Sequence, residues 1–213
     1  MQAIIFDLDG TLLDVREGFY WQYQELTKLL DGAPMSREMI NAAANHGTTE
    51  QIVRSVVRND RIPFDDIMRQ HKLIREEAHN RYLRLYDGVD ELLPILRNMG
   101  FKLAAYTTED QITEAELHKL GIHQYFDVVV TNDHVTHPKP HPEGIDLILD
   151  KLGVDARETA IVGDTVVDIL VGRNAELHKT VGVSHGFGHV HALHAAGADH
   201  VVHNIPSILD VLE

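Results

Sequence analysis

Residues 3–6 form an apolar run without helical spacing, and acidic and polar residues follow it at once. Such a run predicts a short buried strand, and Gly10 and Thr11 mark where the strand has ended. Side chains two positions apart on an extended chain point to the same side. Asp7 and Asp9 are therefore expected to converge at the carboxyl end of this strand.

Apolar residues between positions 15 and 85 recur at helical spacing, as Phe19, Tyr23 and Leu26 do. No part of this segment has the alternation of a convincing strand, so we predict an all-helical unit inserted after the first strand. The expected helices run through residues 19–30, from Ser36, through residues 52–57 and from Pro63 to about Tyr86.

From Asp87 onward, helical and strand patterns alternate, which is typical of a parallel sheet covered on both faces. Pro94 is expected to kink the first of these helices or to mark its true start. The predicted strands are residues 101–106, 126–130, 159–162, 180–183 and 200–202, and the predicted helices are residues 88–99, 111–120, 142–152, 167–177 and 190–196.

Composition limits the classes of protein that the chain can belong to. Its 213 residues, 44% of them hydrophobic, fit one domain with an insertion or two small domains. The formal net charge of −14 argues against nucleic acid or an anionic membrane as a partner. The sequence has no cysteine, which excludes disulfides and thiolate catalysis and favours a cytoplasmic location. No apolar run is long enough to span a bilayer.

Polar side chains follow four of the predicted strands. In an open parallel sheet the carboxyl ends of the strands meet at one edge, which is where ligands bind. Neighbouring carboxylates repel unless a cation or hydrogen bonds intervene, so the acids at this edge indicate a hard metal ion, most plausibly magnesium. The residues expected there are Asp7, Asp9, Thr107, Thr108, Lys139, Asp164 and Asp168.

Each of these residues also has a purely structural interpretation. Asp7 and Asp9 fit an ordinary Asx turn. Thr107 fits a β-branched strand end, Lys139 a solvated loop charge and Asp164 a helix cap. Their joint placement at one edge is what favours a functional site.

Four short segments carry a family resemblance. They are Asp7-Leu8-Asp9-Gly10-Thr11-Leu12, Thr107 after Leu103-Ala104-Ala105-Tyr106, Lys139-Pro140-His141-Pro142, and Gly163-Asp164-Thr165-Val166-Val167-Asp168. In this order they resemble the haloacid dehalogenase-like superfamily, in the subgroup with a helical cap between the first and second motifs. The resemblance implies an α/β fold, with a Rossmann-like parallel sheet core of residues 1–14 and 86–213 and a helical cap domain of residues 15–85.

The resemblance also implies an activity, that of a magnesium-dependent phosphomonoester hydrolase with an aspartyl-phosphate intermediate. Asp7 would be the nucleophile, and Asp9 the general acid and base. Thr107 would hydrogen-bond a phosphoryl oxygen, and Lys139 would offset negative charge. Because Asp9 is acidic where the dehalogenases of the family are not, phosphate chemistry is expected and carbon–halogen cleavage is not.

Mg²⁺ is the implied cofactor, held by the Asp7 carboxylate, the Asp9 carbonyl and Asp164, with Asp168 as a ligand or a support. The implied substrate is a small phosphorylated metabolite, and we expect no nucleic acid or membrane partner and a monomer or homodimer. The helical cap is expected to contact the leaving group and exclude water. The substrate-binding candidates, each of which also fits a solvated surface group, are Arg16, His46, Thr48, Arg54 and Thr108.

Two other functions remain open at this point. A phosphosugar mutase similar to beta-phosphoglucomutase would use the same aspartyl-phosphate and return it to the substrate. A non-enzymatic phospho-acceptor module also combines acids, a hydroxyl and a lysine, but it lacks a helical insertion.

The histidines at positions 185, 189, 191, 194, 200 and 203 match no metal-ligand spacing, and His185 alone is expected to approach the active edge.

Overall fold

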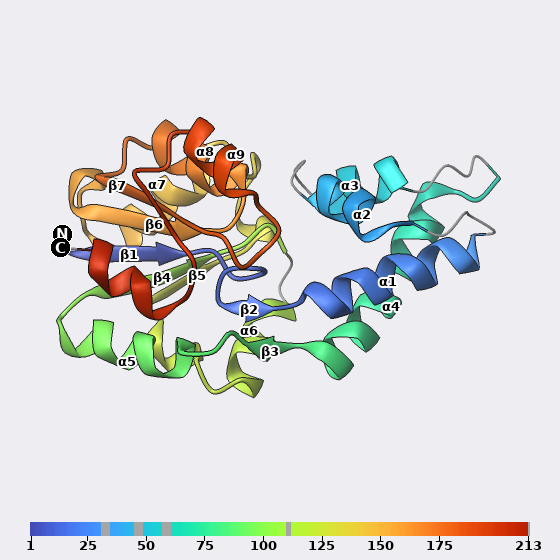
Figure 1. The fold of residues 1–213 in the computed structure, drawn as a ribbon, viewed down its shortest axis with the longest axis horizontal. Coiled ribbons are helices and arrows are strands. Elements are labelled where there is room, and N and C mark those ends of the chain that lie inside the picture. The colour runs from blue at the N-terminus through green and yellow to red at the C-terminus, as the bar shows by residue number, and fades with distance from the viewer. Residues whose placement is uncertain (31–34, 45–48, 57–60, 110–111, 213) are drawn as a thin grey trace.

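The computed structural model describes residues 1–30, 35–44, 49–56, 61–109 and 112–212. In this part of the chain a sheet with helices on both faces forms the core, and helices α1–α4 lie to one side of it as a helical insertion (Figure 1). The sheet has six parallel strands in the order β5-β4-β1-β6-β7-β8. Their bounds are β1 Ala3–Phe6, β4 Lys102–Tyr106, β5 Val128–Val130, β6 Thr159–Gly163, β7 Lys179–Val183 and β8 His200–Val202.

The first strand lies in the middle of the sheet, between β4 and β6. The chain builds β4 and β5 on one side of β1 and then β6, β7 and β8 on the other. Such a reversal of strand order leaves a crevice outside the carboxyl ends of the strands on either side of it. Asp7 follows β1 and Asp164 follows β6, so the fold brings these acids to the crevice.

Alternation along β1 creates the two hydrophobic layers. Ile4 and Phe6 belong to the layer packed against α5, α6 and the short helix η4, whereas Ile5 belongs to the layer packed against α7 and α8. All four β1 residues are fully buried, as expected for a central parallel strand. The elements outside the sheet are α5 Val89–Asn98, α6 Ile112–Lys119, η1 His123–Tyr125, η2 Asn132–His134, α7 Glu143–Leu152, η3 Ala156–Glu158, α8 Val166–Asn174, α9 Val190–Ala195 and η4 Pro206–Val211.

The helical insertion has a hydrophobic core of its own. Tyr23 and Leu26 of α1 pack with Ile40, Val53 and Ile67 from the other three helices, and each of these side chains is buried. No helix in the described part of the chain combines the length and apolar character that crossing a bilayer requires. The bounds are α1 Arg16–Leu29, α2 Arg37–Ala44, α3 Thr49–Val56 and α4 Phe64–Tyr82.

Two short strands connect the insertion to the core. β2 (Leu13–Asp14) and β3 (Arg84–Leu85) form an antiparallel pair beside the predicted domain boundaries. Asp14 accepts a hydrogen bond from the Arg84 guanidinium at 2.7 Å, which ties the two connections together. The prediction of a helix from Pro63 to about Tyr86 is wrong at its end, because Leu83 is extended (φ −64°, ψ 124°) and the chain then pairs with β2.

Most of the other predicted elements are present with small shifts. Pro94 lies inside α5, so it does not mark the start of that helix. β5 begins two residues later than predicted, at Val128, where its pairing with Ala104 of β4 begins. The predicted helix 167–177 ends at Asn174, since Glu176 has a positive φ of 53° that a helix cannot contain.

Candidate active site

Lys139 lies at the centre of the crevice and is almost completely buried. Its Nζ donates hydrogen bonds to Asp7 Oδ1 at 2.8 Å, to Asp168 Oδ1 at 2.7 Å and to the Tyr106 carbonyl oxygen at 2.7 Å. Burial lowers the pKa of Lys139, but the charges of Asp168 and Asp7 outweigh it and raise the pKa above its ordinary value. The interpretation as a solvated loop charge is therefore wrong, and Lys139 is a fixed cation.

Three buried carboxylates cluster in the crevice, and two of them, Asp7 and Asp168, bond to this cation. Oxygens of Asp7, Asp164 and Asp168 lie within 4.8 Å of one another. Burial and the charge of Asp168 raise the pKa of Asp7 to about 6, against the opposing effect of Lys139. Burial and the charges of Asp7 and Asp168 raise the pKa of Asp164 well above its ordinary value. Three acids thus face one lysine, and a second cation would relieve their repulsion.

Backbone and side-chain groups pack closely around the Asp164 carboxylate. Thr11 Oγ1 lies 3.0 Å from Asp7 Oδ2 and 3.2 Å from Asp164 Oδ1, and the Phe187 amide donates to Asp164 Oδ2 at 2.7 Å. Gly10 has a φ of +90°, and a Cβ there would lie 2.4 Å from Asp164 Oδ2. The donor set is entirely oxygen and anionic, which fits Mg²⁺.

Asp168 holds Lys139 and the start of α8 in place. Its Oδ1 accepts from Lys139, and its Oδ2 accepts from the Thr165 amide at 3.0 Å and the Thr165 hydroxyl at 2.6 Å. Its carboxylate thus bonds to Lys139 on one side and to the cap of α8 on the other, which fits a supporting role. Thr165, and not Asp164, is the residue that caps α8.

Asp9 lines the same cavity, and the charged groups that act on it include His79 and Arg75 of the helical insertion. Its side chain is not among the three clustered carboxylates. Burial and the charge of Glu109 raise the pKa of Asp9 to about 7, with His79 and Arg75 opposing the shift. A group with a pKa near neutrality is suited both to give and to take a proton.

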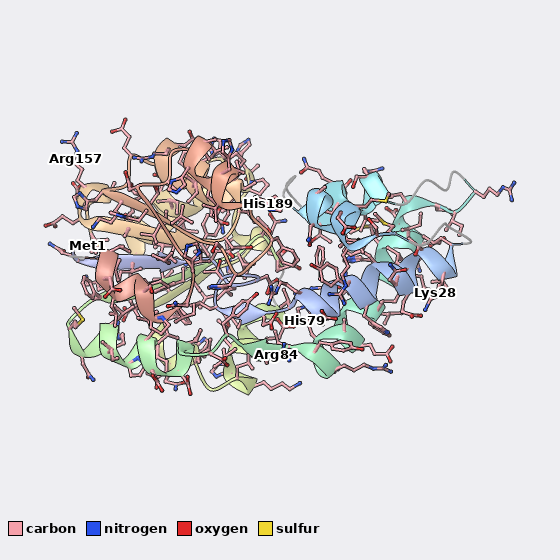
Figure 2. The ribbon with its side chains drawn as sticks, viewed as in Figure 1. Met1, Lys28, His79, Arg84, Arg157 and His189 are labelled. Carbon is pink, nitrogen blue, oxygen red and sulfur yellow. The ribbon has the colours of Figure 1, made fainter. Side chains whose placement is uncertain are left out.

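The insertion and the core meet at a cluster of charged residues that the sequence did not reveal. Arg75 Nε lies 3.1 Å from Glu109 Oε2, and His79 Nδ1 lies 2.6 Å from Glu116 Oε1. Figure 2 shows His79 where the insertion approaches the core. Burial lowers the pKa of His79, but the hydrogen bond to Glu116 and the charge of Asp9 produce a net upward shift.

A signal for this cluster is present in the sequence. His71, Arg75 and His79 recur every four residues on α4, and His71 and Arg75 continue the buried stripe that begins at Ile67. Polar residues on the buried stripe of an amphipathic helix are expected to have polar partners. This pattern would have predicted that α4 lines the site.

The cavity is lined by both parts of the molecule. Thr107 is buried, and its Oγ1 accepts a hydrogen bond from the Glu109 amide at 3.1 Å, which leaves the hydroxyl proton to donate. Thr108, which the sequence analysis named as a substrate-binding candidate, also lines the cavity. The lining includes Asp7, Asp9, Thr107, Thr108, Lys139, Asp164 and Asp168 from the core, and Gln22, Thr49, His71, Arg75 and His79 from the insertion.

Of the substrate-binding candidates in the insertion, the two in the described part of the chain are not brought to this cavity. Arg16 pairs with Asp14 at 3.3 Å, and Arg54 pairs with Glu50 at 2.8 Å, and neither lines the cavity. His46 and Thr48 lie outside the described residues. The next residue, Thr49, lines the cavity and donates to Glu109 Oε1 at 3.2 Å.

His185 approaches the active edge as predicted. Its Nε2 lies 2.9 Å from the Thr11 carbonyl oxygen, so it supports the loop that carries Asp7 and Asp9. Burial lowers the pKa of His185, which favours the neutral ring in this position. In the described chain, no three of the histidines from residue 185 onward come together as metal ligands.

Known proteins share both the sequence pattern and the fold. A family model described as haloacid dehalogenase-like hydrolase matches residues 4–183. The chain is 32% identical to pyrophosphatase PpaX of Bacillus pumilus over 213 residues, which is 100% of this chain and 96% of the relative. It is 31% identical to the N-acetylmuramic acid 6-phosphate phosphatase of Pseudomonas aeruginosa over 216 residues, which is 100% of this chain and 95% of the relative.

Solved structures match over all or nearly all of the chain. CbbY from Rhodobacter sphaeroides, solved in complex with phosphate, has a TM-score of 0.82 at 21% identity and covers 96% of this chain and 94% of its own. A protein from Haemophilus somnus described as a predicted phosphoglycolate phosphatase has a TM-score of 0.90 at 22% identity and covers 100% and 98%. At these identities the likeness shows a shared fold.

Proposed function

The chain belongs to the haloacid dehalogenase-like hydrolase family, and on that premise we propose that it is a magnesium-dependent phosphatase. Its substrate would be the phosphomonoester of a small metabolite, hydrolysed through an aspartyl-phosphate. One observation carries the proposal: Lys139 links Asp7 to Asp168 in the cavity that Asp9 also lines. A nucleophile, a charge-offsetting cation and an acid–base group thus share one cavity.

Asp7 and Asp9 would divide the chemistry. The Asp7 carboxylate attacks phosphorus, forming an acyl phosphate and breaking the bond to the leaving-group oxygen, which takes a proton from Asp9. Water then attacks the acyl phosphate, giving its proton to Asp9 and releasing phosphate and the free Asp7 carboxylate. The pKa of Asp9, raised to about 7 by its burial and by Glu109, suits both directions of transfer.

Positive charge and hydrogen bonds would stabilise the transferring group. Lys139 holds the orientation of Asp7 and offsets negative charge beside it, and the Thr107 hydroxyl would donate to a phosphoryl oxygen. Asp7, Asp164 and the main-chain carbonyl of Asp9 would hold Mg²⁺, which when bound neutralises charge on the carboxylates and the phosphoryl group.

The charges on the insertion side support a hydrolase over a phosphosugar mutase. A mutase must bind a bisphosphate and so needs cations for two phosphoryl groups. Among the described residues that line the cavity, the lysine and arginine side chains are Lys139 and Arg75. Arg75 is paired with Glu109 and lies 3.9 Å from Glu116, so its charge is largely compensated. This arrangement favours a polar leaving group without a second phosphate.

Phosphate release from a panel of phosphorylated metabolites, with and without Mg²⁺, tests the proposal. The panel includes inorganic pyrophosphate, an N-acetylmuramic acid 6-phosphate and a sugar bisphosphate, the last to detect a mutase by transfer without net phosphate release. Asp7→Asn should abolish turnover while its circular dichroism matches the wild type. Asp146→Asn, an exposed acid on α7, is the matched control and should keep full activity. Substantial turnover in Asp7→Asn would overturn the nucleophile assignment.

A further inference from the structure

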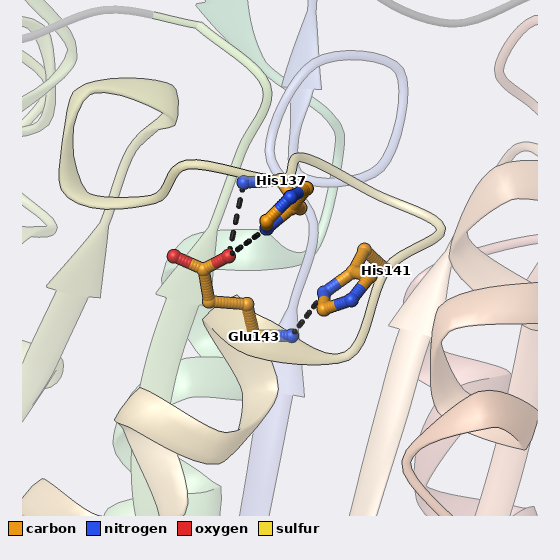
Figure 3. Close-up of side chains that lie close together, drawn as sticks. All are labelled: His137, His141 and Glu143. Carbon is orange, nitrogen blue, oxygen red and sulfur yellow. Dashed lines mark hydrogen bonds and ion pairs between the residues drawn. The ribbon is translucent and has the colours of Figure 1, made fainter.

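A second cluster of ligand side chains lies on the solvent side of the loop that carries Lys139. His137 and His141 are exposed, and Glu143 is half-buried at the start of α7. One nitrogen of each imidazole and one carboxylate oxygen lie within 4.8 Å of one another (Figure 3). In the described chain, this cluster and the three acids of the crevice are the groups with such geometry.

Hydrogen bonds already hold the three side chains together. Glu143 Oε1 accepts from the Thr136 amide at 2.7 Å, and Oε2 accepts from the His137 amide at 3.0 Å. The same Oε2 lies 2.8 Å from His137 Nδ1. His141 Nδ1 accepts from the Glu143 amide at 3.2 Å, and the two imidazole rings lie 4.7 Å apart.

The backbone between these residues is restrained from both sides. Pro138, Pro140 and Pro142 alternate with the other residues of the loop, and each proline fixes its own φ. The buried ammonium of Lys139 anchors the middle of the loop, and Asn174 Nδ2 donates to the Pro140 carbonyl at 2.8 Å. A ligand bound by His137 and His141 therefore has little chain to immobilise.

We propose that His137, His141 and Glu143 bind a divalent transition-metal ion of the zinc class, at a site separate from the acidic crevice. Two imidazoles and one carboxylate are donors that Zn²⁺ accepts, whereas Mg²⁺ prefers oxygen alone. Tetrahedral zinc with ligands at about 2.0–2.1 Å places its donor atoms about 3.3 Å apart. His137 Nδ1 and Glu143 Oε2 lie 2.8 Å apart as hydrogen-bond partners, so they need only move slightly apart for the ion to take the place of the proton between them.

Metal binding here has a consequence for the loop. The ion joins residues on both sides of Lys139 and so opposes unfolding of the segment that presents it to Asp7. Binding to the native state raises the free energy of unfolding with the logarithm of the ratio of ion concentration to dissociation constant, and the unfolding temperature rises with it. This inference does not depend on the proposed phosphatase activity.

Equilibrium dialysis against Zn²⁺ in excess Mg²⁺, with the bound metal quantified, tests the site. The variant is His137→Ala with His141→Ala, and the matched control is His189→Ala with His191→Ala, an exposed pair at the start of α9. Wild type and control should bind one more equivalent than the variant, or bind it at least about tenfold more tightly. Equal binding by the wild type and the variant overturns the proposal.

A second readout follows the ligands themselves. Co²⁺ in place of Zn²⁺ should give a visible absorption band from imidazole ligation in the wild type and the control, and none in the variant. Zn²⁺ should raise the unfolding temperature of the first two proteins and leave that of the variant unchanged; an equal rise in all three contradicts the site. If the double variant does not fold, His137→Gln is measured by the same criteria.

Discussion

Arg75 of the insertion and Glu109 of the core form an ion pair across their boundary, with 3.1 Å between Arg75 Nε and Glu109 Oε2. Both side chains line the cavity, and Glu109 directly follows Thr107 and Thr108. The placement of the insertion over the site is thereby tied to the loop that would contact the phosphoryl group.

Arg75→Ala should raise KM roughly tenfold, with a smaller effect on kcat, because truncating one partner of a buried charge pair costs at least about 1.4 kcal/mol. Steady-state phosphate release measures both constants. Arg81→Ala is the matched control, since Arg81 lies on the same helix and pairs with Glu77 in solvent. A double-mutant cycle with Glu109→Gln should give a coupling energy of about 0.5–3 kcal/mol, and additive effects would show that the pair is not coupled.

Asp7→Asn should stabilise the protein in the absence of divalent metal while removing its activity. Burial, with the charge of Asp168, raises the pKa of Asp7 from 3.8 to about 6, so the ionised carboxylate is disfavoured in the folded state. The folded state binds the Asp7 proton more tightly than the unfolded chain does. This contribution to the free energy of unfolding is full below pH 3.8 and is lost as the pH rises through 6. Urea unfolding in chelator should show a gain of about 1–3 kcal/mol at pH 8 and a much smaller one at pH 4. Asp146→Asn should show no such pH-dependent gain.

Mg²⁺ should raise the unfolding temperature of the wild type and not that of Asp164→Asn. At one hundred times its dissociation constant a ligand specific for the native state contributes about 2.7 kcal/mol. Asp164 is fully buried among like charges, so its replacement would remove a proposed ligand together with a source of repulsion. Differential scanning fluorimetry across a Mg²⁺ series is the measurement, and an undiminished response in Asp164→Asn would exclude Asp164 as a ligand.

His71 should make the protein lose stability in mild acid. Burial lowers its pKa from 6.5 to about 4, with the side-chain amide of Gln22 donating to Nε2. Because the unfolded chain binds the proton more readily, stability is full above pH 6.5 and falls by up to about 3 kcal/mol as the pH drops through 4. Unfolding free energies at several pH values should fall less steeply in His71→Gln. The exposed His200→Gln should keep the wild-type slope, and an unchanged slope in His71→Gln would contradict the prediction.

The core of the site could be predicted from the sequence because its geometry is local. Asp7, Thr107 and Asp164 each follow a strand directly, and parallel strands end at a common edge. Lys139 was harder to place, since a loop lysine flanked by prolines is usually solvated, and only the packing of that loop beneath the crevice buries it.

The insertion side could not be predicted in the same way. Whether Arg75 faces solvent or the cavity depends on how α4 packs against a loop more than thirty residues away in sequence. The end of α4 at Tyr82 is set by pairing with Leu13 and Asp14, a contact between two strands too short to produce any pattern of their own. Both features arise from tertiary contacts that override local propensity.

The pairing of Asp14 with Arg84 brings the two ends of the helical insertion together, so the insertion could be exchanged as one segment. The chain enters the helical insertion after β2 and leaves it at β3, and these two strands pair with each other. If the insertion were removed, a tight turn could therefore join Asp14 directly to Arg84. A segment of different shape could be grafted at the same two points without rerouting any strand of the sheet. Under the proposed function, such a graft would exchange the side chains that face the leaving group while Asp7, Thr107, Lys139 and Asp164 keep their places at the ends of the sheet strands.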